Sequence, residues 1–301
     1  MKILQPSSLK KGDIIAITCP AGYLDPAKTR KCIQTLQQWG YQVLVGNTLK
    51  GKSKNYFSAS DEERVNELQA MLDAPEIKAI LCGRGGYGIS RIIDALDFKK
   101  FKKNPKWVIG FSDITLLHAH VHQQCNIASI HAPMAAAFNE KNNQYLLSLQ
   151  NALAGKYSCY ETKKHRLNRK GKGEGLIVGG NLALITHAIG TPSALKTKNK
   201  ILFIEDIGEH IYQIDRMMVQ LKRSGMLANL AGLIVGHFTD IKDTERPFGK
   251  TVYQTIKEHV DEYAYPVCFG FPVGHEKENL ALKIGSTYTL KVEKNRVMLS
   301  E

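Results

Sequence analysis

Short apolar runs alternate with helical patterns through the first half of the chain, and this alternation limits the fold more than any other feature. The runs cover residues 14–18, 43–45, 79–82 and 107–109. One helical segment opens with Ser60-x-x-Glu63, a capping box in which each side chain can bond the other residue's backbone N–H. Strands that alternate with helices build parallel sheets covered by helices on both faces. We therefore predict an α/β domain with a parallel sheet.

The alternation stops at residues 156–175, which are rich in Lys, Arg, Gly and Asn. Such a composition is typical of a connecting segment. We therefore expect a basic linker there, between an N-terminal domain of residues 1–155 and a C-terminal domain of residues 176–301. Further strands are expected at residues 176–178, 201–204, 233–235, 267–269, 288–292 and 297–299. The last two resemble a hairpin, which predicts a mixed sheet in the C-terminal domain.

Composition narrows the class of protein. The chain has 301 residues, of which 43% are hydrophobic and 23% are charged, as in soluble globular proteins. The chain has no apolar run long enough to cross a bilayer. Pro6 and the pair Lys10-Lys11 interrupt any signal-peptide core near the start. These features lead us to expect a cytoplasmic protein with no membrane partner.

The formal net charge of +13 raises the question of nucleic acid. The lysines gather at residues 99–103 and 163–172, without a regular basic helix or interleaved aromatic residues. We therefore expect no nucleic-acid partner, only a general attraction for anionic ligands. The six cysteines form no Cys-x-x-Cys pair, so reduced structural thiols are expected, and no metal or cofactor is predicted.

The segment Gly110-Phe111-Ser112-Asp113 follows an apolar run and places a serine where a buried strand turns into a helix. A hydroxyl at such a turn stands clear of its own backbone, and the N–H groups that open the helix can face a developing negative charge. The pattern departs from Gly-x-Ser-x-Gly, because Ile114 stands at the second glycine. From this local pattern alone, Ser112 is a candidate nucleophile or a helix N-cap.

Residues 83–88, Gly-Arg-Gly-Gly-Tyr-Gly, follow another apolar run and precede a helical pattern. They match the letters of the dinucleotide fingerprint, but that motif belongs to the first strand–helix turn and needs an acid after the next strand. Here the next strand leads to Ser112 instead. Bare backbone at the carboxyl edge of a sheet can also present N–H groups to an oxyanion formed at a neighbouring serine. We favour that interpretation, with a plain tight turn as the alternative.

Two further candidate catalytic residues follow expected strands of the C-terminal half. Glu205 comes directly after the run at residues 201–204, and His275 lies in a loop after the run at 267–269. With Ser112 they supply a nucleophile, an orienting acid and a general base in the order Ser, acid, His. The competing set is His118 and His122, which share a helix face at the spacing of a metal pair. The carboxylate that a zinc hydrolase places beside the first histidine is replaced by alanine, so packing or exposure is the favoured role for both.

At this point the chain resembles the L,D-carboxypeptidase family of serine peptidases, the group that includes muramoyl-tetrapeptide carboxypeptidases and microcin C immunity amidases. The matching segments run in the family's order over most of the chain. They are Gly-Arg-Gly-Gly-Tyr-Gly (83–88), Gly-Phe-Ser-Asp (110–113), Gly-Gly-Asn-Leu (179–182), Glu-Asp-Ile-Gly-Glu (205–209), Tyr212, Ile-Asp-Arg (214–216) and Gly-His (274–275).

The resemblance implies a fold and a set of roles. The fold would be a flavodoxin-like N-terminal domain with a smaller, mixed C-terminal domain of the swivelling β-barrel type. The site would lie at their interface, and the enzyme would be a homodimer. The implied roles are Ser112 as nucleophile, His275 as general base, Glu205 as its orienting acid, and an oxyanion hole from a backbone N–H of Gly85 or Gly86 and that of Asp113.

The implied substrate is a murein tetrapeptide that loses its terminal D-alanine during peptidoglycan recycling. Such a peptide is anionic, so Arg84 is a candidate to hold its carboxylates, with a structural ion pair as the alternative role. Two other functions stay open. An amidase of the microcin immunity type would need an aromatic-bearing loop, and neither Trp39 nor Trp107 stands in a suitable place. A non-catalytic anion-binding module would keep the glycine loop but do no chemistry, and the presence of Ser112, Glu205 and His275 at strand ends argues against it.

Overall fold

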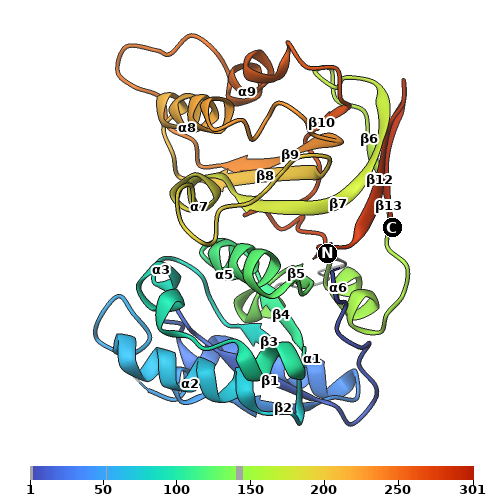
Figure 1. Ribbon diagram of the computed structural model, residues 1–301. Helices are drawn as coiled ribbons and strands as arrows, with labels where there is room; N and C mark the ends of the chain where they lie inside the picture. The colour runs from blue at the N-terminus through green and yellow to red at the C-terminus, as the bar shows by residue number, and fades with distance from the viewer. Residues whose placement is uncertain (1–2, 52, 140–144) are drawn as a thin grey trace. The chain divides into compact units, whose positions relative to one another are not determined.

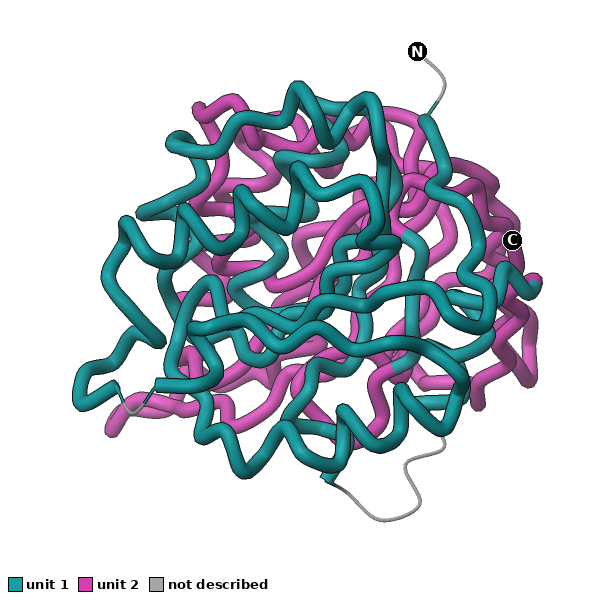
Figure 2. Tube along the Cα trace, turned by 90° about the horizontal axis from the view of Figure 1, so that it is seen from below, with its two compact units in different colours: residues 1–156, 280–283 teal, residues 157–279, 284–301 magenta. Residues whose placement is uncertain are grey.

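The computed structural model describes residues 3–51, 53–139 and 145–301. The described chain divides into two compact units, coloured separately in Figure 2. The first unit comprises residues 1–156 with residues 280–283, and the second comprises residues 157–279 with residues 284–301. In the described part of the chain, no helix combines the length and the hydropathy needed to span a membrane.

The first unit is built on a sheet in which the described strands take the order β11-β5-β4-β3-β1-β2. The pairs β1–β2, β1–β3, β3–β4 and β4–β5 are parallel (Figure 1). The order β2-β1-β3-β4-β5 is that of a flavodoxin-like sheet, which confirms the predicted fold. The strand bounds are β1 Ile14–Thr18, β2 Gln42–Val45, β3 Ile77–Cys82, β4 Trp107–Gly110, β5 Ser129–His131 and β11 Leu282–Ile284.

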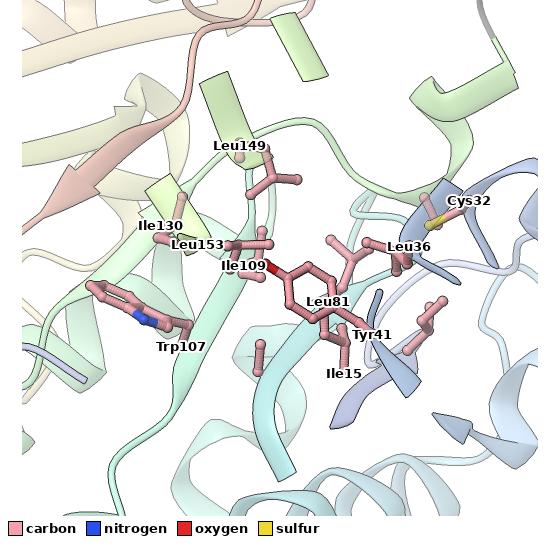
Figure 3. Close-up of a cluster of buried hydrophobic side chains, with 14 of the residues drawn as sticks. Ile15, Cys32, Leu36, Tyr41, Leu81, Trp107, Ile109, Ile130, Leu149 and Leu153 are labelled. Atoms are coloured by element: carbon pink, nitrogen blue, oxygen red, sulfur yellow. The ribbon is translucent and has the colours of Figure 1, made fainter. Parts of the chain in front are cut away.

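Alternate residues of a strand point to opposite faces of the sheet, and in β1, β3, β4 and β5 almost every residue is buried. Ile15, Leu81 and Ile109 pack with Leu36 and Leu149 in one hydrophobic cluster (Figure 3). The helices of this unit are α1 Arg30–Gln38, α2 Asp61–Asp73, α3 Ile89–Ile92, α4 Lys99–Lys103, α5 Ile114–His120 and α6 Tyr145–Leu153. The predicted capping box at the start of α2 is confirmed, with both of its hydrogen bonds formed.

The second unit holds a mixed sheet whose described strands take the order β10-β9-β8-β7-β12-β13-β6. Its strands are β6 Cys159–Lys163, β7 Gly171–Asn181, β8 Ile201–Ile207, β9 Gly232–Thr239, β10 Val267–Phe269, β12 Thr287–Val292 and β13 Arg296–Ser300. The predicted hairpin is the antiparallel pair β12–β13. The helices are α7 Leu182–His187, α8 Ile211–Arg223 and α9 Val252–Val260.

The long strand β7 joins the two parts of this sheet. Its first half pairs antiparallel with β12, and its second half pairs parallel with β8. The end strands β10 and β6 do not pair with each other. The resemblance implied a barrel-like domain, but the described strands form an open sheet. In this sheet β7 joins a parallel half to an antiparallel half, and the two end strands stay apart.

Residues 156–175, expected as a basic linker, contain β6 and the first residues of β7. β6 lies at the edge of the sheet and, among the described strands, pairs with β13 in antiparallel fashion. Its side chains alternate between exposed and half-buried positions. An edge strand with one solvent-exposed face can consist of charged and polar residues. The composition of β6 therefore resembles that of a loop.

Candidate functional site

Ser112 lies in the turn between β4 and α5, in a strained backbone conformation. Its φ is +64°, in the left-handed region, which non-glycine residues rarely adopt and which concentrates at functional sites. The residue assigned as the N-cap of α5 is Asp113, the next residue. A strained serine just before a helix is the geometry of a nucleophile elbow.

The missing second glycine of the motif has a local explanation. A Cβ on Gly110 would lie 3.0 Å from Cγ1 and 3.1 Å from Cγ2 of Ile114. The side chain of Ile114, fully buried, therefore occupies the space that the first glycine leaves open. The turn keeps its close packing with one glycine instead of two.

The glycine loop at residues 83–88 packs directly against Ser112. A Cβ on Gly85 would lie 2.9 Å from Cβ and 3.2 Å from Oγ of Ser112, and 3.2 Å from the backbone N of Asp113. On its other side, the Gly85 carbonyl accepts a hydrogen bond from Gly22 N–H at 3.0 Å. The loops that follow β1, β3 and β4 thus meet at the carboxyl edge of the parallel sheet, where α/β proteins bind ligands.

The Asp113 side chain links the serine turn to the segment that follows the glycine loop. Its Oδ2 accepts a hydrogen bond from Ile89 N–H at 2.8 Å, at the start of α3, and the residue is 1% exposed. The family resemblance implied a role only for the backbone N–H of Asp113. This second role could not be read from the motif, because it depends on how close α3 comes to the serine turn.

Glu205 and His275 meet in the second unit, although 70 positions separate them in the sequence. The Nδ1 atom of His275 lies 2.6 Å from Oε2 of Glu205. The Glu205 side chain is fully buried, and that of His275 is 12% exposed. Gly274 is required beside them, because a Cβ there would lie 3.1 Å from Oε2 of Glu205.

The pKa of His275 reflects opposing effects. Burial lowers it, but the hydrogen bond to Glu205 and the negative charges of Glu205 and Asp206 outweigh burial and hold this pKa above its ordinary value of 6.5. A carboxylate at Nδ1 favours the tautomer with its proton on that nitrogen. The neutral ring then carries its lone pair on Nε2, as a general base requires.

Asp206 and Asn181 support this pair from the neighbouring strand ends. Asp206 accepts hydrogen bonds from Asn181 Nδ2 at 2.8 Å and from Ala183 N–H at 2.9 Å. Asn181 also caps α7 through Leu184 N–H. Burial, and then the charge of Glu205, raises the pKa of Asp206 to about 7. The Gly-Gly-Asn-Leu segment therefore serves to anchor the strand end that carries Glu205.

The competing histidines lie inside the first unit. His118 and His122 are 1% and 3% exposed, and His118 Nε2 lies 2.9 Å from the carbonyl oxygen of Gly110. Burial lowers the pKa of His118 to about 4, against the opposing effect of that bond. The described residues contain no cluster of His, Cys, Asp and Glu suited to a metal. Both side chains are buried within the first unit.

The remaining sequence candidates also have defined positions. Arg84 is exposed and donates a hydrogen bond from Nη1 to the Tyr23 carbonyl at 2.6 Å. Trp39 packs against Phe138 with ring centroids 6.0 Å apart. Trp107 is 3% exposed and donates from Nε1 to a backbone carbonyl. Both tryptophans therefore contribute to the interior of the first unit, and neither stands on a loop that could stack on a nucleobase.

A groove of about 820 Å³ between β2 and α2 is lined by none of the described site candidates. Glu67 lies in it and accepts hydrogen bonds from the hydroxyl groups of Thr18 and Thr48, both at 2.6 Å. That carboxylate has structural partners, so we assign the groove no role in the chemistry of Ser112.

Two domain models of one family match consecutive parts of the chain. The model of the LD-carboxypeptidase N-terminal domain matches residues 15–132, and that of the C-terminal domain matches residues 174–290. The probable murein peptide carboxypeptidase of Bacillus subtilis is 36% identical over 287 residues, which cover 94% of this chain and 90% of that protein.

Solved structures share the fold. The muramoyltetrapeptide carboxypeptidase from Oxalobacter formigenes aligns with a TM-score of 0.87 and 29% identity, over 95% of this chain and 98% of that one. A microcin self immunity protein aligns with a TM-score of 0.87 over 99% of this chain and 98% of that one, but at 23% identity, which speaks for the fold alone. With both domain models matched in order, the chain belongs to the LD-carboxypeptidase family.

Proposed function

We propose that this protein is a serine carboxypeptidase that releases the terminal D-alanine from murein tetrapeptides. The observation that carries the proposal is the 2.6 Å bond between His275 and the buried Glu205, because it prepares a general base of the kind that activates a serine. The strained conformation of Ser112 supports its role as the nucleophile. The names of the relatives support a murein peptide as substrate.

In the proposed mechanism, Ser112 Oγ attacks the scissile carbonyl while His275 takes its proton. The buried carboxylate of Glu205 stabilises the imidazolium that forms. His275 then returns the proton to the leaving amine of D-alanine. A water molecule, deprotonated by the same histidine, hydrolyses the acyl-enzyme and restores Ser112.

The oxyanion hole is assigned to the N–H groups of Gly86 and Asp113. A trans peptide bond points its C=O and N–H in opposite directions. Because the Gly85 carbonyl is turned toward Gly22, the N–H of Gly86 is directed away from Gly22. Asp113 N lies 3.2 Å from the position that a Gly85 Cβ would take. These two donors are the best candidates to stabilise a developing negative charge at the serine.

Arg84 is assigned to the carboxylates of the substrate. The guanidinium has donors beyond the one that bonds Tyr23, and the chain's net charge of +13 favours an anionic peptide. We further propose that the enzyme acts in the cytoplasm in peptidoglycan recycling, as a homodimer and without a cofactor.

Gly85→Ala is expected to lower kcat/KM by about 10²-fold, because the new Cβ would displace Ser112 and the oxyanion donors from their reactive arrangement. The backbone φ of Gly85 lies outside the left-handed region, so alanine adds no φ strain there, and the nearest contacts of the new Cβ are with the serine turn. Steady-state kinetics on a D-alanine-terminated tetrapeptide measure the effect. Gly51→Ala is the matched control, because no atom lies within 4 Å of a Cβ there. Wild-type turnover by Gly85→Ala would contradict the assigned loop.

The proposed reaction is tested with three tetrapeptides that end in D-Ala, D-Ala-amide and L-Ala. An exopeptidase must bind the free carboxylate of the leaving residue, so amidation is expected to lower kcat/KM by about 10- to 100-fold. The L-Ala peptide should react more slowly still, because inversion moves its methyl and carboxylate groups out of the reactive geometry. Equal cleavage of the L-Ala and D-Ala peptides would replace the proposal with a general amidase.

A further inference from the structure

Tyr56 is an exposed aromatic residue beside the glycine loop of the first unit. Its side chain is 56% exposed, and its hydroxyl oxygen lies 2.9 Å from the position that a Cβ on Gly86 would occupy. Gly86 is itself exposed and has a φ of +90°. The phenol group therefore stands over bare backbone, one residue along the loop from the point at which Gly85 contacts Ser112.

The segment around Tyr56 is fastened to the loop that follows β1. The Tyr56 carbonyl accepts a hydrogen bond from Tyr23 N–H at 3.0 Å, and Ser58 N–H donates to the Ala21 carbonyl at 3.2 Å. The Ser58 hydroxyl also donates to the Cys19 carbonyl at 2.5 Å. These bonds hold the backbone of Tyr56 in place although its side chain is exposed.

Aromatic packing orients the ring. Phe57 meets Tyr56 edge to face, with ring centroids 5.3 Å apart. The guanidinium carbons of Arg64 and Arg91 lie 4.8 Å and 5.4 Å from the centroid of the Phe57 ring. Asp61 forms ion pairs with both arginines. A solvent-exposed tyrosine on a purely structural surface does not need such support, whereas preorganised binding groups do.

The three glycines beside Tyr56 make a surface without side chains. A Cβ on Gly22 would lie 2.8 Å from the Gly85 carbonyl oxygen, and 3.8 Å from Nε of Arg84. The backbone of Gly22, Gly85 and Gly86 is therefore in close contact, with Arg84 beside Gly22 and the Tyr56 hydroxyl beside Gly86. Ser112 adjoins the same surface at Gly85.

We propose that the Tyr56 hydroxyl, together with Arg84, binds the terminal carboxylate of the residue that is cleaved off. This inference rests on the proposed carboxypeptidase function. In a carboxypeptidase substrate the terminal carboxylate lies one residue beyond the scissile carbonyl, and one residue spans about 3.8 Å. The Tyr56 hydroxyl lies beside Gly86, whereas Ser112 lies beside Gly85, the preceding residue of the loop. A phenol O–H and a guanidinium form charge-assisted hydrogen bonds with a carboxylate.

The test compares Tyr56→Phe with the wild type on the D-Ala and D-Ala-amide tetrapeptides. Phenylalanine keeps the ring and its packing and removes the hydroxyl alone. With the free carboxylate, kcat/KM is expected to fall about 10-fold or more, mainly through a higher KM, as for a group that binds substrate and transition state alike. With the amide, the change is expected to stay under about threefold, because the charge-assisted bond is already lost.

Tyr157→Phe is the control, since Tyr157 is an exposed tyrosine whose hydroxyl bonds a backbone carbonyl in the second unit. Its kinetics should match those of the wild type, and thermal unfolding should show an unchanged Tm for both variants. Equal losses by Tyr56→Phe on both peptides, or no loss on either, would overturn the carboxylate assignment and leave the proposed function standing. A wild-type protein that cleaves neither peptide would overturn the proposed function and this assignment with it.

Discussion

Ser112→Ala is expected to lower kcat on the D-Ala tetrapeptide by at least about 10³-fold, as removal of a triad nucleophile does. The loss follows from chemistry alone, because alanine keeps Cβ and with it the contact to Gly85. Any residual rate would come from the oxyanion donors and from substrate binding. KM should change little, because the hydroxyl acts mainly in the transition state.

Two measurements separate this chemical effect from a loss of structure. Thermal unfolding of Ser112→Ala should give a Tm at or slightly above that of the wild type, because alanine is no more strained than serine at φ +64°. A fluorophosphonate probe should label the wild type and leave Ser112→Ala unlabelled, since only an activated serine reacts. Near-normal turnover by the folded variant would rule out Ser112 as the nucleophile.

Glu205→Gln is expected to lower kcat by about 10³- to 10⁴-fold with a smaller effect on KM. Its amide NH₂ can donate to Nδ1 of His275, which would favour the tautomer that carries its proton on Nε2. A histidine in that tautomer cannot accept the serine proton. The buried negative charge that stabilises the imidazolium is lost as well. Glu161→Gln, at an exposed position of β6, is the matched control and should behave as the wild type.

The pH dependence of kcat/KM tests the role of Glu205 independently of the rate at neutral pH. Because His275 must be neutral to act as a base, wild-type kcat/KM should fall as the pH drops through a pKa above the ordinary 6.5. In Glu205→Gln the bond and the charge that raise this pKa are weakened or absent, while burial still lowers it. The acid limb of the variant should therefore move to lower pH. An unshifted limb, or wild-type activity at neutral pH, would show that Glu205 does not act on His275.

Local patterns predicted the parts of this fold that local physics controls. The apolar runs became β1, β3 and β4 because each is buried on both faces, and Ser60 and Glu63 formed the capping box because both of its bonds lie within one turn. Residues 156–175, expected as a linker, contain the edge strand β6, whose polar composition resembles that of a loop. β11 escaped prediction because a three-residue strand at residues 282–284 carries too little periodicity.

The sequence by itself determined most strands of the two sheets and the residue types suited to acyl transfer: a serine after β4, an acid in the last part of β8 and a histidine after β10. The tertiary structure alone decided which groups meet. Glu205 and His275 form their bond because β8 and the loop after β10 converge. Gly85 must be glycine because the serine turn packs against it, and Tyr56 reaches Gly86 through backbone bonds to the loop after β1. Such contacts join residues far apart in the chain, and a pattern of neighbouring residues carries no information about them.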